Sequence, residues 1–294
     1  MGLVAVSLPL LGAATIVLAA SDEPARAVPG PAAAEIQRAV TTGNAGSLED
    51  ARVRLRSGPS AQGLDEAALY LRAYVAWRLS YFHPRGSERS QALLGEAEQD
   101  LDRVLSLDPG DAEALALLGS AIGSRITGVW SGLSRGPRAA RALDRAFELA
   151  PDNPRVVMLL GISRLYRPAP FGGGIARAEQ ELERARALFA HEPAEAPWPN
   201  WGRAEVLAWL GQTALRRGDL EKAGAFYRQA LEIEPDYDWV CRSLLPELAG
   251  RRTAASGTLA PGSWTMSPRA ETAGTSRRSV GEAYTAGGTP MSAR

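Results

Sequence analysis

Cysteine, histidine and lysine are the scarce residues of this 294-residue chain, which has one Cys, two His and a single Lys at position 222. A lone Cys241 excludes an internal disulfide, and we expect it to be buried in a helix. The formal net charge is zero, so charge gives no support to a nucleic-acid partner. The composition is instead rich in Ala, Leu, Glu and Arg, which favours an all-α protein.

The two histidines, His83 and His191, have no convergent set of Ser, Asp, Glu or Cys near them in the sequence. Catalytic triads and metal centres both need such partners. The sequence therefore predicts no enzyme, no cofactor and no metal. The glycine run at 171–175 lacks the Gly-Lys-Ser/Thr of a phosphate-binding loop and follows a helix. We interpret it as a hairpin turn, whose free N–H groups at 172–174 would hold an anion only weakly.

The N-terminal residues 1–20 are apolar and uncharged, and they end in Leu-Ala-Ala, a small-residue site of the kind that signal peptidase accepts. We expect a signal peptide or N-terminal anchor at 1–20 and a Pro/Ala linker at 21–31. The protein would then be exported, and either periplasmic or tethered to a membrane. No Lys or Arg precedes the apolar run, which leaves the alternative of a cytoplasmic protein. Residues 250–294 are rich in Gly, Ser and Thr and show no helical or strand period, which predicts a disordered tail.

Helical periodicity is clearest in residues 204–235, AEVLAWLGQTALRRGDLEKAGAFYRQALEIEP. Apolar residues recur there at i, i+3, i+4 spacing on both sides of a central Gly-Asp pair, which predicts two amphipathic helices joined by a tight turn. Asp219 is the expected N-cap of the second helix, and Pro235 ends it. The small residues Gly211 and Ala223 stand where the two helices must approach closely.

The same stretch resembles the tetratricopeptide repeat (TPR), whose pattern places a large apolar residue, Leu-Gly, Ala, an aromatic, Ala and Pro at fixed offsets. The matching residues are Leu207, Leu210, Gly211, Gly218, Ala223, Tyr227, Ala230 and Pro235. Ala214 departs from the pattern, because the family usually has Tyr there. Weaker copies lie upstream. The resemblance therefore implies an all-α, right-handed superhelical solenoid of about four TPR-like hairpins over residues 32–249.

The spacing of the repeats exceeds the usual length. Pro109 and Pro151 lie 42 residues apart, and Pro151 and Pro235 lie 84 apart, against about 34 in the family. The surplus falls in three insertions, at 127–136, 167–174 and 191–201. The first two separate the helices of a hairpin, so we expect them at one edge of the stack, where they build a binding feature. In the third, Trp198 and Trp201 form either a packing plug or an exposed recognition edge.

The resemblance also implies a function, because stacked repeats present a concave surface that binds a protein or peptide. In such proteins the first helix of each pair lines this surface. The expected groove residues here are Glu113, Ser120, Arg155, Met158, Ile162, Glu205, Gln212 and Arg216. Arg155 and Arg216 would clamp a peptide carboxylate.

Two hypotheses follow from these residues. The leading one is a non-enzymatic scaffold for a protein or peptide partner in the bacterial envelope. The alternative is a small-ligand binding accessory protein. Its pocket would be closed by the insertions at 167–174 and 191–201, and it would be lined by Tyr166, Trp198 and Trp201.

Overall fold

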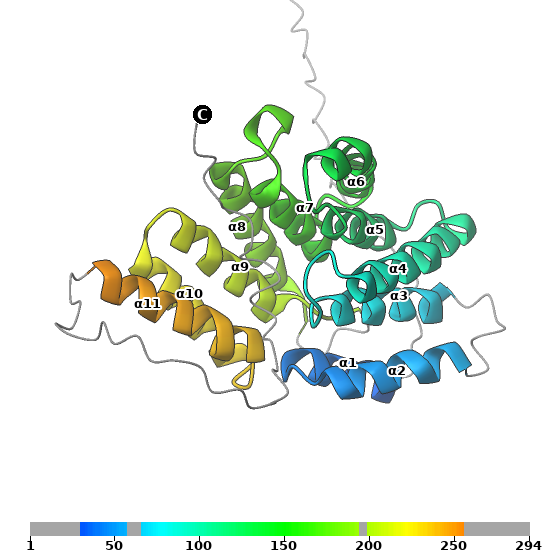
Figure 1. Ribbon diagram of the computed structural model, residues 1–294, viewed down its shortest axis with the longest axis horizontal. Coiled ribbons are helices and arrows are strands. Elements are labelled where there is room, and N and C mark those ends of the chain that lie inside the picture. The colour runs from blue at the N-terminus through cyan, green and yellow to red at the C-terminus, as the bar shows by residue number, and fades with distance from the viewer. Residues whose placement is uncertain (1–29, 58–65, 194–198, 256–294) are drawn as a thin grey trace, which may run out of the picture.

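The computed structural model describes residues 30–57, 66–193 and 199–255, and within these ranges every regular element is a helix (Figure 1). The prediction of an all-α fold is confirmed. The helices pair as hairpins, which stack into a right-handed superhelical solenoid. The expected leader, most of the expected linker and most of the expected tail lie outside the described residues.

Ten of the described helices form five consecutive hairpins, and the last four hairpins have the most closely packed partners. The pairs are α1 (Gly30–Thr41) with α2 (Ala45–Ser57), α3 (Glu66–Ser80) with α4 (Glu88–Leu107), α5 (Ala112–Ser124) with α6 (Val129–Leu149), α7 (Pro154–Tyr166) with α8 (Ile175–His191), and α9 (Arg203–Arg216) with α10 (Leu220–Ile233).

Polar residues placed just before the helices start them. The side chains of Ser87, Asp111, Asn153 and Asp219 accept hydrogen bonds from backbone N–H groups of the first turns of α4, α5, α7 and α10. These groups have no partner inside the helix, so a capping oxygen stabilises the helix start. The predicted N-cap at Asp219 is confirmed by its bond from the N–H of Lys222, 2.9 Å long.

Close helix packing explains the small residues of the last repeat. A Cβ added to Gly211 would overlap the ring of Tyr227, which is fully buried against α9. Ala223 on α10 is also fully buried. Glycine at position 211 thus lets the aromatic ring of one helix lie directly on the backbone of the other.

The insertion at 127–136 is helical, unlike the loop that the repeat pattern indicates. Helix α6 begins at Val129, and Pro137, the expected start of the helix, lies inside it. The Ser131 hydroxyl oxygen accepts hydrogen bonds from the backbone N–H groups of Thr127 and Gly128, each 3.0 Å long. These bonds cap the N-terminus of the extended α6. The insertion therefore lengthens one helix of the hairpin beyond its partner.

The C-terminal helix is longer than its pattern predicts. A π-helical turn, η3 (Val240–Leu244), leads into α11 (Leu245–Ala255), which runs past the expected end of the repeat domain at 249. Pro246 provides a physical reason for the wide turn, because proline lacks an N–H and its ring crowds the carbonyl four residues earlier. Cys241 lies on this turn and is exposed, so the prediction of a buried cysteine was wrong.

The two ends of the described solenoid meet. Helix α1 lies beside the C-terminal helices at the bottom of Figure 1. The Thr41 hydroxyl donates a hydrogen bond of 2.7 Å to the carboxylate of Glu234, at the end of α10. Next to it, Gly43 adopts a φ of 65° and packs so closely on Asp238 that a side chain there would collide with the Asp238 carboxylate. The solenoid is thus a closed arc rather than an open one.

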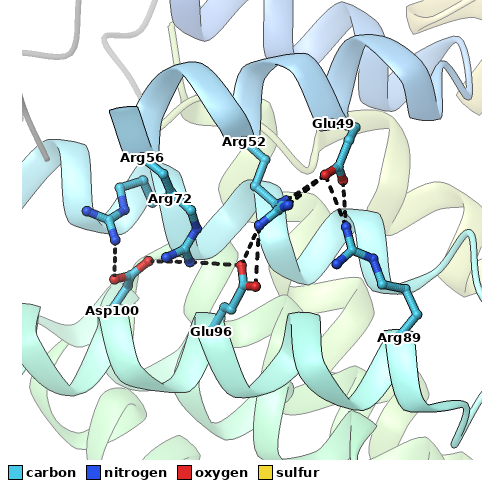
Figure 2. Close-up of polar contacts among 7 residues, drawn as sticks. All are labelled: Glu49, Arg52, Arg56, Arg72, Arg89, Glu96 and Asp100. Carbon is cyan, nitrogen blue, oxygen red and sulfur yellow. Dashed lines mark hydrogen bonds and ion pairs between the residues drawn. The ribbon is translucent and has the colours of Figure 1, made fainter. Parts of the chain in front are cut away.

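A network of ion pairs holds α2 and α3 to α4 (Figure 2). Its members are Glu49, Arg52 and Arg56 of α2, Arg72 of α3, and Arg89, Glu96 and Asp100 of α4. Arg72 reaches Asp100 at 3.0 Å with both side chains buried. Burial raises the pKa of Asp100, and the guanidinium groups of Arg72 and Arg56 oppose that rise. Every member has a partner of opposite charge, so the network stabilises the packing of α2 and α3 against α4.

We expect Gly211→Ala to lower the free energy of unfolding by about 1–3 kcal/mol, because the new methyl group would displace the buried Tyr227 ring. Gly250→Ala on α11 is the matched control. A methyl group there meets nothing within 4 Å, so the substitution should stabilise by about 0.4–1 kcal/mol. Urea unfolding monitored by circular dichroism measures both. Equal stability of Gly211→Ala and the parent chain would contradict the packing described here.

Candidate functional site

A buried ion pair joins the first helix of the second hairpin to the first helix of the last. The Arg78 guanidinium of α3 donates to both carboxylate oxygens of Glu205 on α9, at 2.9 and 2.5 Å. The rings of Tyr74, Trp77 and Trp201 surround its Cζ atom at 5.0, 4.4 and 5.0 Å. The pair lies on what would be the concave face of an open solenoid, so the contact fills that face.

Half of the eight predicted groove residues lie inside the protein. Arg155, Met158, Glu205 and Gln212 are all buried. The Arg155 guanidinium donates to Glu113 at 2.9 Å, to Glu192 at 2.5 Å and to the carbonyl of Trp201 at 3.2 Å. These partners occupy it, which leaves no free guanidinium for the expected carboxylate clamp.

The remaining groove residues lie nearer the solvent. Arg216 is exposed and stacks on Tyr166, with 4.5 Å between its Cζ atom and the ring centre. Ser120 and Ile162 are half-buried and, together with Glu205, line a large cavity. Three of the eight predicted groove residues thus come together at this cavity.

The cavity has a volume of about 760 Å³ and is bounded by α3, α4, α5, α6, α7 and α9. Its walls are mainly apolar. They include Trp77, Leu94, Leu133, Leu159, Ile162 and Trp209. Cavities of roughly 300–1,000 Å³ with apolar walls and a few polar groups are the usual sites for small ligands.

Two insertions form part of the wall, in keeping with their expected position at one edge. Of the two that the ligand hypothesis named, 167–174 lines the cavity, whereas the described residues of 191–201 do not. Residues of both 127–136 and 167–174 line the cavity. Trp201 does not line the cavity. Its side chain is only 1 % exposed, and its ring centre lies 5.2 Å from that of Tyr74. This is the packing interpretation of Trp201, whereas Trp198 lies outside the described residues.

Large apolar side chains stand exposed at the edge formed by these insertions. Val129, Trp130, Leu133 and Phe171 keep 77 %, 84 %, 61 % and 67 % of their surface in solvent. Val129, Leu133 and Phe171 also line the cavity. We call these four residues the apolar rim. Clustered exposed apolar side chains usually mark a contact site for another molecule.

The glycine run of the second insertion has no anion-binding amides. The N–H groups of Gly172, Gly173 and Gly174 donate to the carbonyls of Ala169, Pro168 and Arg164. The loop thus satisfies its own backbone, and the interpretation as a hairpin turn fits it better than a weak anion site does.

The polar groups of the cavity are few. Burial, helped by the nearby charge of Arg89, lowers the pKa of His83, so its imidazole is neutral at pH 7. The indole N–H of the buried Trp77 has no hydrogen-bond partner. Among the described residues no cluster of His, Cys, Asp or Glu is arranged to hold a metal ion. Within the same residues no helix is both long and apolar enough to span a bilayer.

Comparisons with known proteins agree with this geometry. The family model of the tetratricopeptide repeat matches residues 204–237. The chain is similar to TTC0263, a thermophilic TPR protein of Thermus thermophilus, at 20% identity and a TM-score of 0.51 over 75% of this chain and 98% of that one. It is also similar to the HusA haemophore of Porphyromonas gingivalis, at 27% identity and a TM-score of 0.50 over 64% and 96%. A comparison with curated protein sequences finds no match.

The fold and the repeat pattern together define a helical-repeat solenoid. More particularly, α9 and α10 form a tetratricopeptide repeat, the most regular one of the chain. Folds of this kind are repeat scaffolds for protein interaction.

We expect Arg78→Met to destabilise the protein by about 3–5 kcal/mol, because it leaves Glu205 buried without its partner. The double variant Arg78→Met/Glu205→Leu should recover most of this loss, since it removes both charges from the interior. Urea unfolding of the two variants and the parent chain measures the difference. If the double variant is no more stable than the single one, the pair does not act as a unit.

Proposed function

We propose that this protein is a non-enzymatic TPR scaffold that binds a protein or peptide partner at the insertion edge rather than on the concave face. The observation that carries the proposal is the position of the apolar rim. The concave face is occupied by Arg78, Glu205 and their aromatic neighbours, whereas the rim is exposed beside a cavity.

The chemistry of the rim defines the partner segment. A segment with one or two large apolar side chains would place them in the cavity, while its backbone would lie along α6 and the 167–174 loop. Trp130 is the strongest candidate contact, because large aromatic residues supply most of the binding energy at many interfaces.

We expect benzoylphenylalanine in place of Trp130 to photo-crosslink a defined protein partner in cells of the source organism. The same amino acid at Ile233, an exposed apolar position far along the chain on α10, is the control and should capture none. The variant Trp130→Ala/Phe171→Ala should then weaken binding of the identified partner by about tenfold or more. Capture at both positions, or unchanged affinity of the double variant, would contradict the proposed edge.

A second candidate function is the binding of a small apolar ligand in the cavity. The volume of about 760 Å³ favours it, and so does the similarity to HusA, a haemophore. Haem is therefore the ligand to test first. Packing against the apolar walls would contribute to such binding, and His83, which lines the cavity, is the available axial ligand.

Haem titration followed by its Soret absorbance should saturate at one haem per chain if this candidate is right. Gly123→Phe should abolish saturation, because Gly123 lines the cavity and a side chain there meets nothing within 4 Å. Gly250→Phe, on exposed α11, is the matched control and should bind as the parent does. If both variants bind haem as the parent chain does, the haem site lies outside the cavity.

We also propose that the protein is exported and works in the envelope. The support is the apolar segment 1–20 with its small-residue end. N-terminal sequencing of the protein purified from its source should begin after residue 20 if the segment is a cleaved signal. Intact protein in the membrane fraction indicates an anchor, and intact protein in the cytoplasm would contradict export.

A further inference from the structure

The charged groups that line the cavity include more uncompensated positive than negative charges. They are Arg85, Asp144, Arg167 and Glu205, since His83 is neutral. The Glu205 charge is compensated by Arg78. That leaves two guanidinium groups against the single carboxylate of Asp144, which sits on the exposed side of α6.

The two arginines make only neutral contacts among the described residues. Arg85 donates to the carbonyl of Ile126 at 2.5 Å, and Arg167 donates to the hydroxyl of Ser163 at 3.2 Å. Most other arginines of the described chain that face a neighbouring helix have a carboxylate partner. Positive charge without a counter-ion at an apolar cavity is complementary to an anion.

Both arginines are held where the cavity opens. The bond from Arg85 ties the α3–α4 turn to the segment that precedes α6, and Arg167 follows the last residue of α7. Tyr166 keeps 38 % of its surface exposed, yet burial raises the pKa of its hydroxyl to about 12, and Arg216 and Arg85 oppose that rise. Arg85, Tyr166 and Arg167 all line this cavity, and Tyr166 precedes Arg167 in the chain.

The inner end of the cavity has a different character. It is formed by apolar side chains, among them Leu94 and Leu159, and by the buried ring of Trp77. A ligand that satisfies both ends needs an apolar body for the interior and a negatively charged group for the two guanidiniums. Hydrogen bonds from guanidinium to carboxylate, sulfonate or phosphate are charge-assisted and directional.

We propose that the cavity binds an amphipathic organic anion, with its apolar body against Trp77, Leu94 and Leu159 and its anionic group at Arg85 and Arg167. This inference rests on the second candidate function above, that the cavity is a small-ligand site, and it adds the chemical class of the ligand. A neutral molecule of the same shape would bind more weakly.

Two fluorescent probes of nearly the same shape test the proposal. Anilinonaphthalene sulfonate is an anion, and N-phenyl-naphthylamine has the same aromatic body without the charge. We expect the parent chain to bind the anionic probe about tenfold more tightly than the neutral one, in keeping with hydrogen bonds to a charged group. The variant Arg85→Gln/Arg167→Gln should lose that preference and bind both probes alike.

Two controls separate the site from general effects. Arg103→Gln/Arg228→Gln removes the same charge from exposed helix positions that do not line the cavity and should retain the preference. Gly123→Phe should exclude both probes, whereas Gly250→Phe should exclude neither.

The outcomes distinguish failure of the small-ligand function from failure of the anionic ligand class. If neither probe binds the parent chain, or if Gly123→Phe leaves binding unchanged, the small-ligand function itself fails. If both probes bind in the cavity with equal affinity, or if Arg85→Gln/Arg167→Gln keeps the preference, the cavity is a ligand site but the anionic class is overturned.

Discussion

The bidentate pair between Arg78 and Glu205 is the contact on which the rest of the structure depends. It joins residues 127 positions apart and is enclosed by Tyr74, Trp77 and Trp201. A buried pair of this kind is costly to desolvate, so its value lies in fixing one arrangement of the helices it connects. Here the arrangement is the closure of α9 onto α3, which converts a row of hairpins into an arc with a filled centre.

Closure of the centre has a direct effect on where the protein can bind. In an open solenoid the first helices of the repeats line an accessible surface, but Arg155 and Met158 on α7 are buried in this protein. The exposed apolar side chains lie at the edge, where α6 and the 167–174 loop extend beyond the regular repeat. The insertions supply the apolar rim and part of the cavity wall, so under the proposed function they would set the specificity of the scaffold.

Local signals predicted the helices well, because caps, periodicity and small residues act over a few positions. Asp219 and Gly211 were identified in this way, and the structure confirms both roles. The extension of α6 was missed because Pro137 resembles the start of a helix. The burial of Arg155 was missed for a different reason: it depends on Glu192 and on the closure of distant hairpins, which no repeat pattern encodes. The repeat pattern pointed to the cavity residues Ser120, Ile162 and Glu205, and the insertions gave a second signal. Arg85 and Trp77 gave no signal, because they belong to separate elements.

The link between Thr41 and Glu234 bears on how the protein folds. Repeat proteins normally gain stability from neighbour to neighbour, so their ends fray and partly folded forms are populated. A chain whose first and last described hairpins touch must instead form contacts of very long sequence separation, which slows folding and makes unfolding more concerted. Amide hydrogen exchange in α1 and α10 should accordingly report a common opening event, and deletion of the N-terminal pair would loosen the opposite end of the molecule.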